Sequence, residues 1–310
     1  MADIPAGPGR WAVRPVAPQP RSVVELISTG TLDAELAATL WILIEGRVPL
    51  IVAADAPGTG SSTLLAALLD FIPPKVRVVE VAGATETFDW LPQASELGWE
   101  RRAGRSAVSS GPSIRPADGG LPVRPDHTVL LVPELSDRLP TTTWGETARI
   151  VVRAAAIGYG LAATMRADRL EAVFEALRRP PVSLAADELS RLGLVLLLRR
   201  VEGDRRRLVA AHYVRPLARD EHGHVQRLGP AVLATWDPER DALEHFGWGV
   251  MPELAVRVGR KAGDFEVEVG RRRALLDGLV VAGRSSTGDV RAAIDAYRAT
   301  SQTPVSSTVE

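Results

Sequence analysis

The pattern of hydrophobic and polar residues along this chain predicts α-helices and β-strands that alternate. A helical pattern is expected to open at Thr31, with Asp33 and Glu35 in its first turn, where acids complement the helix dipole. The continuous apolar run 50–54 predicts a short buried strand, and 62–71 returns to the helical period. A strand, a glycine-rich turn and a helix therefore follow one another.

The same alternation continues along the chain. Further strands are predicted at 76–81, 128–132, 160–164, 194–198 and 207–214, with helices at 143–157, 168–177, 271–281 and 288–299. The stretch 103–126 is rich in Gly, Ser, Pro and Arg and predicts a long loop or irregular hairpin. Strands alternating with helices predict an α/β fold with a mostly parallel sheet covered on both faces.

Changes in composition suggest four segments. Residues 1–21 are rich in Pro, Ala and Gly and predict a disordered leader, and 22–245 forms the α/β core. Residues 246–300 predict a small C-terminal helical subdomain, and 301–310 a flexible tail. We expect no separate domain before the core.

Charge and cysteine content narrow the function classes. The formal net charge of -1 gives no global field for nucleic acid, so no nucleic-acid partner is expected. The chain has no cysteine, which excludes disulfides, thiolate catalysis and Cys-ligated metals. Its longest apolar run, 36–44, is too short to span a bilayer, and no signal-peptide core precedes it. A cytoplasmic location is expected.

The glycine-rich turn, Asp55 to Thr63, approaches a known phosphate-binding pattern. In a P-loop, G-x-x-x-x-G-K-[ST] lies between a strand and a helix, and its backbone N–H groups surround phosphate oxygens. Here Gly60 and Ser62 fit the pattern. Asp55 stands in place of the first glycine and Ser61 in place of the lysine, so the charge is lost. Taken alone, this stretch also suits any α/β turn.

Several further stretches, in order, resemble the type II/IV secretion ATPase family, which includes the pilus and archaellum assembly motors. These stretches are Gly30-Thr31-Leu32 with Leu40 to Glu45, Ser62 to Leu68 with Phe71 to Pro74, Arg124-Pro125-Asp126 with Glu134, Ala163 to Asp168, 178–182, and 271–297. The resemblance implies a RecA-like P-loop core, ATP and magnesium as ligands, and a ring of subunits. It also implies secretion or pilus machinery at the inner face of the membrane as partners of a homo- or hetero-oligomer.

The resemblance also assigns site residues. The expected nucleotide-binding residues are Gly58, Thr59, Gly60, Ser61, Ser62 and Thr63, with the Ser62 hydroxyl holding magnesium. Glu134 takes the position of the catalytic glutamate.

Other family positions differ. The acidic box falls at Ala82-Gly83 with only Glu86 kept, and the histidine of the histidine box falls at Arg166. Arg166 is the candidate replacement for the lysine, and its alternative is a surface arginine after a strand. The cluster 205–207 is interpreted as a solvated hairpin tip that could touch phosphate.

Three hypotheses follow. The first is a degenerate secretion-motor ATPase with weak or lost hydrolysis and a regulatory or structural role. The second is a working ATPase with a rearranged phosphate site. The third is an interaction module that binds no nucleotide, which the acidic Asp55 favours.

Overall fold

The computed structural model describes residues 20–100, 123–139, 142–219, 222 and 224–301. The predicted leader, tail and most of the 103–126 loop lie outside these ranges. Within them, eight strands form one sheet in the order β10-β9-β6-β5-β1-β4-β3-β2. No helix in the described ranges combines the length and apolar character needed to span a membrane.

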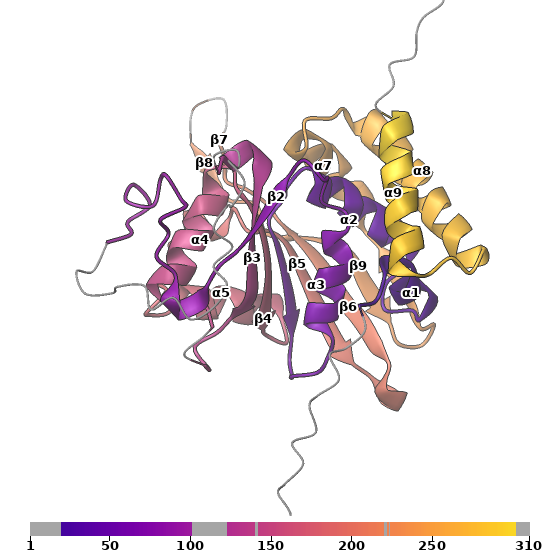
Figure 1. Cartoon of the computed structure of the whole chain (residues 1–310), viewed down its shortest axis with the longest axis horizontal. Helices are drawn as coiled ribbons and strands as arrows, with labels where there is room; N and C mark the ends of the chain where they lie inside the picture. Colours follow the sequence, from indigo (N-terminus) through magenta and orange to yellow (C-terminus); the bar gives the residue numbers. More distant parts are fainter. Residues whose placement is uncertain (1–19, 101–122, 140–141, 220–221, 223, 302–310) are drawn as a thin grey trace, which may run out of the picture.

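Five strands run parallel in the middle and at one edge of the sheet (Figure 1). They are β2 (Arg77–Glu80), β3 (Thr128–Leu135), β4 (Gly160–Arg166), β1 (Leu50–Ala54) and β5 (Gly193–Arg200). Antiparallel strands extend the other edge, namely β6 (Arg206–Val214), β9 (Ala231–Asp237) and β10 (Ala242–His245). A separate pair is β7 (Ala218–Arg219) with β8 (Val225–Gln226). This mostly parallel sheet confirms the predicted α/β class of the core.

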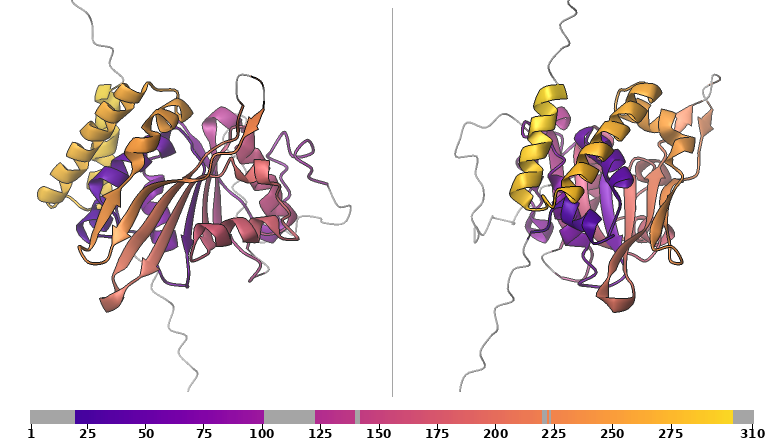
Figure 2. Two further views of the ribbon diagram at one scale, coloured as in Figure 1. Left: turned by 180° about the vertical axis from the view of Figure 1, so that it is seen from behind. Right: turned by 90° about the vertical axis from the view of Figure 1, so that its right-hand side faces the viewer.

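Helices cover both faces of the sheet (Figures 1 and 2). On one face lie α1 (Val23–Ser28), α2 (Ala34–Glu45), α3 (Ser61–Leu69), α7 (Met251–Arg257), α8 (Ala262–Val281) and α9 (Thr287–Ser301). On the other lie α4 (Glu146–Ala156), α5 (Leu170–Arg178) and α6 (Ala186–Leu189). Side chains of β1 point alternately to the two faces of the sheet. Val52 packs with the first group of helices and Ile51 with the second.

The C-terminal helices share the core of the sheet. Phe265 of α8 and Ile294 of α9 are fully buried in the same cluster as Trp41 of α2. Trp41 also stacks on Phe71, with ring centroids 5.1 Å apart. The helices are therefore bound to the α/β core through apolar packing, and the predicted boundary at residue 246 stays a prediction.

Several predicted element boundaries were wrong. The first predicted helix begins at Ala34 instead of Thr31, because Asp33 is its N-cap and accepts a hydrogen bond from the Leu36 N–H. Strand β3 continues through Pro133 to Leu135, since a bulge after Val132 accommodates the proline.

Other elements were not predicted. Helices α1, α6 and α7 and the strands β7 to β10 were missed, and α8 begins nine residues before the predicted 271–281 helix. Gly263, Gly270 and several charged residues interrupt the apolar positions of α8. The helical periodicity of its hydrophobic residues is therefore weak in the sequence. The missed strands and helices α1 and α6 are at most seven residues long, so their period is hard to see.

Candidate functional site

The glycine-rich turn lies at the carboxyl edge of the parallel strands. Strand β1 ends at Ala54, which pairs with Arg166 at the end of β4 and with Leu198 near the end of β5. Open α/β sheets bind ligands at this edge. The tertiary structure therefore brings the predicted loop, Arg166 and the hairpin that follows β5 to one end of the molecule.

Two left-handed glycines shape the turn. Gly58 has φ 75° and Gly60 has φ 104°, a region that side-chain-bearing residues rarely adopt. Thr59 between them is buried, and its hydroxyl donates to the Ala56 carbonyl at 2.8 Å and to Asp55 Oδ1 at 3.4 Å. The Thr59 side chain thus holds the turn together instead of facing the cavity beside it.

Helix α3 begins at Ser61 without a side-chain cap. Gly60 is its N-cap and supplies no hydrogen-bonding side chain. The first N–H groups of an α-helix have no partner within the helix, and with the helix dipole they favour an anion. Ser61, Ser62 and Thr63 present this helix start to a cavity of about 1020 Å³ that Gly58 and Gly60 also line.

Two arginines of the β5–β6 hairpin lie against the loop. Arg200 Nη2 donates to the Gly58 carbonyl at 3.3 Å, and Arg206 Nη2 lies 3.5 Å from the same oxygen. A Cβ added to Gly60 would stand 2.9 Å from Arg206 Cδ, so the missing side chain makes room for this arginine. Arg206 Nε is buried and has no hydrogen-bond partner among the described residues.

This geometry restores positive charge to a loop that has no lysine. Arg206 lines the cavity together with Ser61, Ser62 and Thr63, and its Nη2 lies 3.9 Å from Asp204, which also lines the cavity. A buried donor without an acceptor costs free energy, about 1–3 kcal/mol, and an anion on the loop would remove that cost. The described residues therefore fit a phosphate group.

The predicted catalytic pair lies on neighbouring strands. Arg166 Nε is 4.0 Å from Glu134 Oε1, and both side chains are partly buried. The bulge in β3 places Glu134 here, and the Pro133 carbonyl accepts a hydrogen bond from the Thr164 hydroxyl. Neither Arg166 nor Glu134 is among the residues lining the loop cavity. Their catalytic roles stay predictions.

Glu86, the acid kept from the family's acidic box, has a structural position. It is buried, and one oxygen accepts from the N–H groups of Thr87 and Phe88 and from the Trp90 indole. Its other oxygen accepts from the Ala82 N–H. Four donors therefore hold this carboxylate within its own loop.

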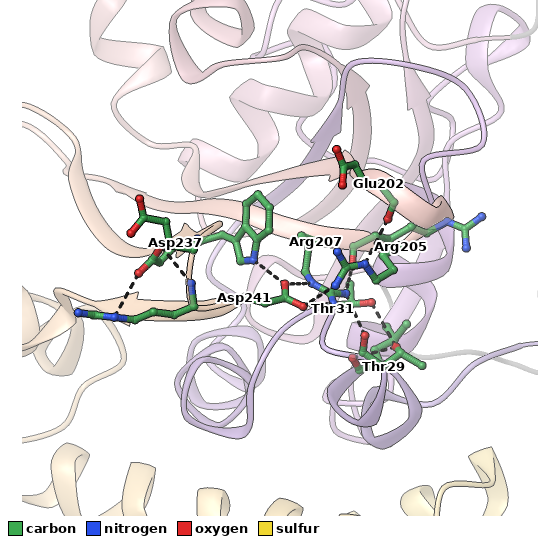
Figure 3. Close-up of polar contacts among 12 residues, drawn as sticks. Thr29, Thr31, Glu202, Arg205, Arg207, Asp237 and Asp241 are labelled. Carbon is green, nitrogen blue, oxygen red and sulfur yellow. Dashed lines mark hydrogen bonds and ion pairs between the residues drawn. The ribbon is translucent and has the colours of Figure 1, made fainter.

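The interpretation of 205–207 as a solvated tip was wrong for Arg207 (Figure 3). Arg207 is buried and makes two 2.7 Å contacts with the Asp241 carboxylate, and its Nη1 donates to the Thr29 carbonyl. The hydrogen bond from Arg207, joined by that from Trp236, holds the pKa of Asp241 well below its usual range. Arg207 thus joins the hairpin to the end of α1.

The sequence did not identify Arg200 as a neighbour of the loop, and Arg206 was named only as part of the cluster 205–207 that could touch phosphate. Two signals were available, a predicted strand pair and an arginine cluster at its turn. The hydrogen bond from Arg206 to Gly58 spans 148 residues, and only the pairing of β1 with β5 defines it.

A magnesium site has less support than a phosphate site. Ser62 is exposed in the first turn of α3 and lines the cavity, as predicted for a magnesium ligand. Among the residues described, no group of three or more His, Asp or Glu side chains could hold a metal ion. Ser62 is the one predicted metal ligand, and the carboxylates that line the same cavity are Glu25 and Asp204, of which Asp204 pairs with Arg200 and Arg206.

Comparison with known proteins found no matching protein-family model. Two relatives come from Methanocaldococcus jannaschii, the uncharacterized proteins MJ1287 and MJ0900. The first is 28% identical over 177 residues, which is 56% of this chain and 60% of MJ1287. The second is 24% identical over 285 residues, which is 89% of this chain and 48% of MJ0900. The chain therefore spans about half to three fifths of these relatives.

Two solved structures are similar to parts of the chain. One is the VirB11 ATPase from the Brucella suis type IV secretion system in complex with sulphate, at 22% identity and TM-score 0.34, covering 58% of this chain and 52% of VirB11. The other is the Legionella pneumophila ATPase DotB, at 15% identity and TM-score 0.28, covering 76% of this chain and 55% of DotB. Each match covers little more than half of the ATPase with which it aligns.

Proposed function

We propose that this chain is a P-loop ATPase-fold protein that binds a nucleotide through phosphate, has weak or lost ATP hydrolysis, and acts as a regulatory or structural component of a secretion or pilus assembly. The observation that carries the proposal is the loop itself. It keeps its glycine turn and uncapped helix, carries Ser61 in place of lysine, and is faced by Arg206.

Weak hydrolysis follows from the charges at the loop. Phosphoryl transfer depends on positioned charge more than on covalent chemistry by the protein. Ser61 offers a neutral hydroxyl, Glu86 is held by four N–H donors, and Glu134 faces Arg166 at 4.0 Å. An arginine against the loop supports phosphate binding, while the acids that would assist turnover are engaged elsewhere.

The assembly role rests on the ordered resemblance to secretion and pilus motors. In this proposal the protein acts in the cytoplasm, peripheral to the inner face of a membrane, in a homo- or hetero-oligomer with secretion machinery. Magnesium at Ser62 belongs to the same proposal.

A second candidate is an interaction module that binds no nucleotide. The observation that favours it is that Arg200 donates to the Gly58 carbonyl and that Arg206 Nη2 lies 3.5 Å from the same oxygen. In this candidate function, the two guanidinium groups bind the loop carbonyl in place of a phosphate group.

Calorimetry of ATP binding, with and without magnesium, tests the proposal on wild type, Ser61→Lys and the matched control Ser61→Ala. We expect wild type to bind weakly and Ser61→Lys to bind at least ~10-fold more tightly, because a charge-assisted contact contributes about 1.5–3 kcal/mol. Ser61→Ala should resemble wild type. Magnesium-dependent turnover at motor-like rates would contradict the proposal, and so would an absence of binding by every variant, which would favour the interaction module.

A further inference from the structure

A second cavity lies at the opposite edge of the sheet from the glycine loop. Its volume is about 830 Å³, and it is lined by Arg47 just before β1, Lys75 just before β2 and His127 just before β3. Residues of α8 and α9 close its other side. The cavity thus lies at the amino ends of the parallel strands, where the core meets the C-terminal helices.

The lining of this cavity contains more cations than acids. Six arginine or lysine side chains and four carboxylates line it, on a chain whose formal net charge is -1. The acids already have partners. Glu45 contacts Arg272 at 2.5 Å and Arg298 at 3.0 Å, Glu268 contacts Arg272 at 2.8 Å, and Asp295 contacts Arg298 at 3.2 Å. The fourth carboxylate, Asp126, contacts His127 at 2.9 Å.

Four cations of the lining make no ion pair with any described residue. They are Arg47, Lys75, Arg260 and Arg271. They come from four separate segments, which the fold gathers around one cavity. Like charges repel when they are brought together without counter-charges, so this arrangement favours an anionic ligand.

Two buried donors point to the same conclusion. Arg47 Nε is buried without a hydrogen-bond partner among the described residues. Arg272 is 3% exposed in its side chain, and its Nη1 also has no such partner. Buried donors that lack acceptors are rare in folded proteins and call for a group that satisfies them.

We propose that this cavity binds an organic ligand carrying more than one phosphate group. Arginine forks match phosphate oxygens in bidentate geometry, and the cations of the lining come from several separate segments. Ile42, Val76 and Val258 supply apolar lining for an organic part. The volume lies within the range of about 300–1,000 Å³ typical of small-molecule sites.

Isothermal titration with inorganic pyrophosphate tests this site on the full chain. Wild type is compared with the double variant Arg260→Ala/Arg271→Ala. Arg240→Ala serves as the matched control, because Arg240 is an exposed arginine paired with Glu244 and does not line the cavity. Arg206→Ala reports on the glycine loop separately. We expect saturable binding that weakens at least ~10-fold in the double variant and changes little in the Arg240 control.

The outcomes distinguish binding in this cavity from binding at the glycine loop. They also distinguish a lipid headgroup from a free organophosphate as the ligand. Binding lost in Arg206→Ala but kept in the double variant would overturn the proposal, as would no binding by wild type. Vesicles that contain cardiolipin, a lipid with two phosphate groups, identify the source, with phosphatidylcholine vesicles as controls. Cosedimentation that pyrophosphate reverses and the double variant abolishes supports the site with a lipid headgroup as ligand. Pyrophosphate binding without cosedimentation supports it with a free organophosphate.

Discussion

The hydrogen-bonded pair Asp33 and His245 joins two distant parts of the chain through single side chains. Asp33 Oδ1 caps α2 by accepting from the Leu36 N–H, and its Oδ2 lies 2.7 Å from His245 Nε2 at the end of β10. Burial pulls the pKa of His245 down, but the hydrogen bond and charge of Asp33, with Glu35, outweigh it and raise that pKa. Burial pushes the pKa of Asp33 up, and the bonds from His245 and Leu36 lower it overall.

These shifts predict a pH-dependent stability. The raised histidine pKa contributes stability that is full below about pH 6.5 and is lost as pH rises through the folded pKa. The lowered pKa of Asp33 contributes stability that is full above about pH 3.9, and this stability is lost as pH falls through the pKa of the folded state. We therefore expect His245→Gln to lower Tm more at pH 5.5 than at pH 9. The difference between the two pH values corresponds to about 1 kcal/mol or less in the free energy of unfolding, because the pair is partly exposed.

Thermal melts across this pH range provide the measurement. Asp33→Asn is the matched control, since asparagine also caps helices but carries no charge. It should reduce the same pH dependence while keeping the cap. Equal losses of Tm for His245→Gln at both pH values would show that the pair contributes no charge interaction.

The β5–β6 hairpin is the element that carries charge to the glycine loop. Arg200 and Arg206 pair across the hairpin, and both lie against Gly58. Arginine presents a planar, permanently charged fork, whereas the lysine that it stands in for would be a point charge from the loop itself. The position of the positive charge is therefore set by strand pairing.

A variant of this hairpin tests whether the positive charge of Arg206 assists or blocks ATP binding at the glycine loop. Arg206→Ala should weaken ATP binding about 10-fold, because one charged hydrogen bond to phosphate is lost. Arg199→Ala removes the same charge from an exposed position of β5 outside the cavity lining, so calorimetry should find it close to wild type. Tighter binding by Arg206→Ala would mean that the arginine occupies the phosphate position.

At the scale of the whole molecule, one apolar cluster unites the sheet and the C-terminal helices. Arg272 extends this contact, since its guanidinium carbon lies 4.6 Å from the Trp41 ring centroid and its Nη2 contacts Glu45. The cavity of about 830 Å³ at the amino ends of the parallel strands is lined by residues of the same helices. The C-terminal helices therefore contribute to the stability of the core and to the lining of that cavity.

Two neighbouring residues of α8 test this shared core. Phe265 is fully buried, whereas Val267 is 54% exposed. Phe265→Ala should cost about 3–5 kcal/mol in the free energy of unfolding, because it leaves a cavity in the cluster. Val267→Ala should stay within about 0.5 kcal/mol of wild type. Urea denaturation measures both, and a single transition is expected. A small loss for Phe265→Ala, or two transitions, would indicate helices that fold apart from the sheet.

The sequence by itself determined the class of the fold and the place of the glycine turn. Continuous apolar runs such as 50–54 and 194–198 predicted buried strands, and their alternation with helical patterns predicted a mostly parallel sheet, in which β1 and β5 do pair parallel. Gly58 and Gly60 mark a turn that requires left-handed backbone, and the structure contains it. Such signals are local, because periodicity and backbone conformation depend on near neighbours.

Only the tertiary structure decided which charges meet. Arg206 and Gly58 are 148 residues apart, and Arg298 and Glu45 are 253 apart. Arg207 and Arg206 are adjacent in sequence, yet one is buried against Asp241 and the other faces the loop. Long-range pairing and the alternation of side chains across a strand set these contacts. The residues that give both cavities their charge could not be identified before the sheet brought them together.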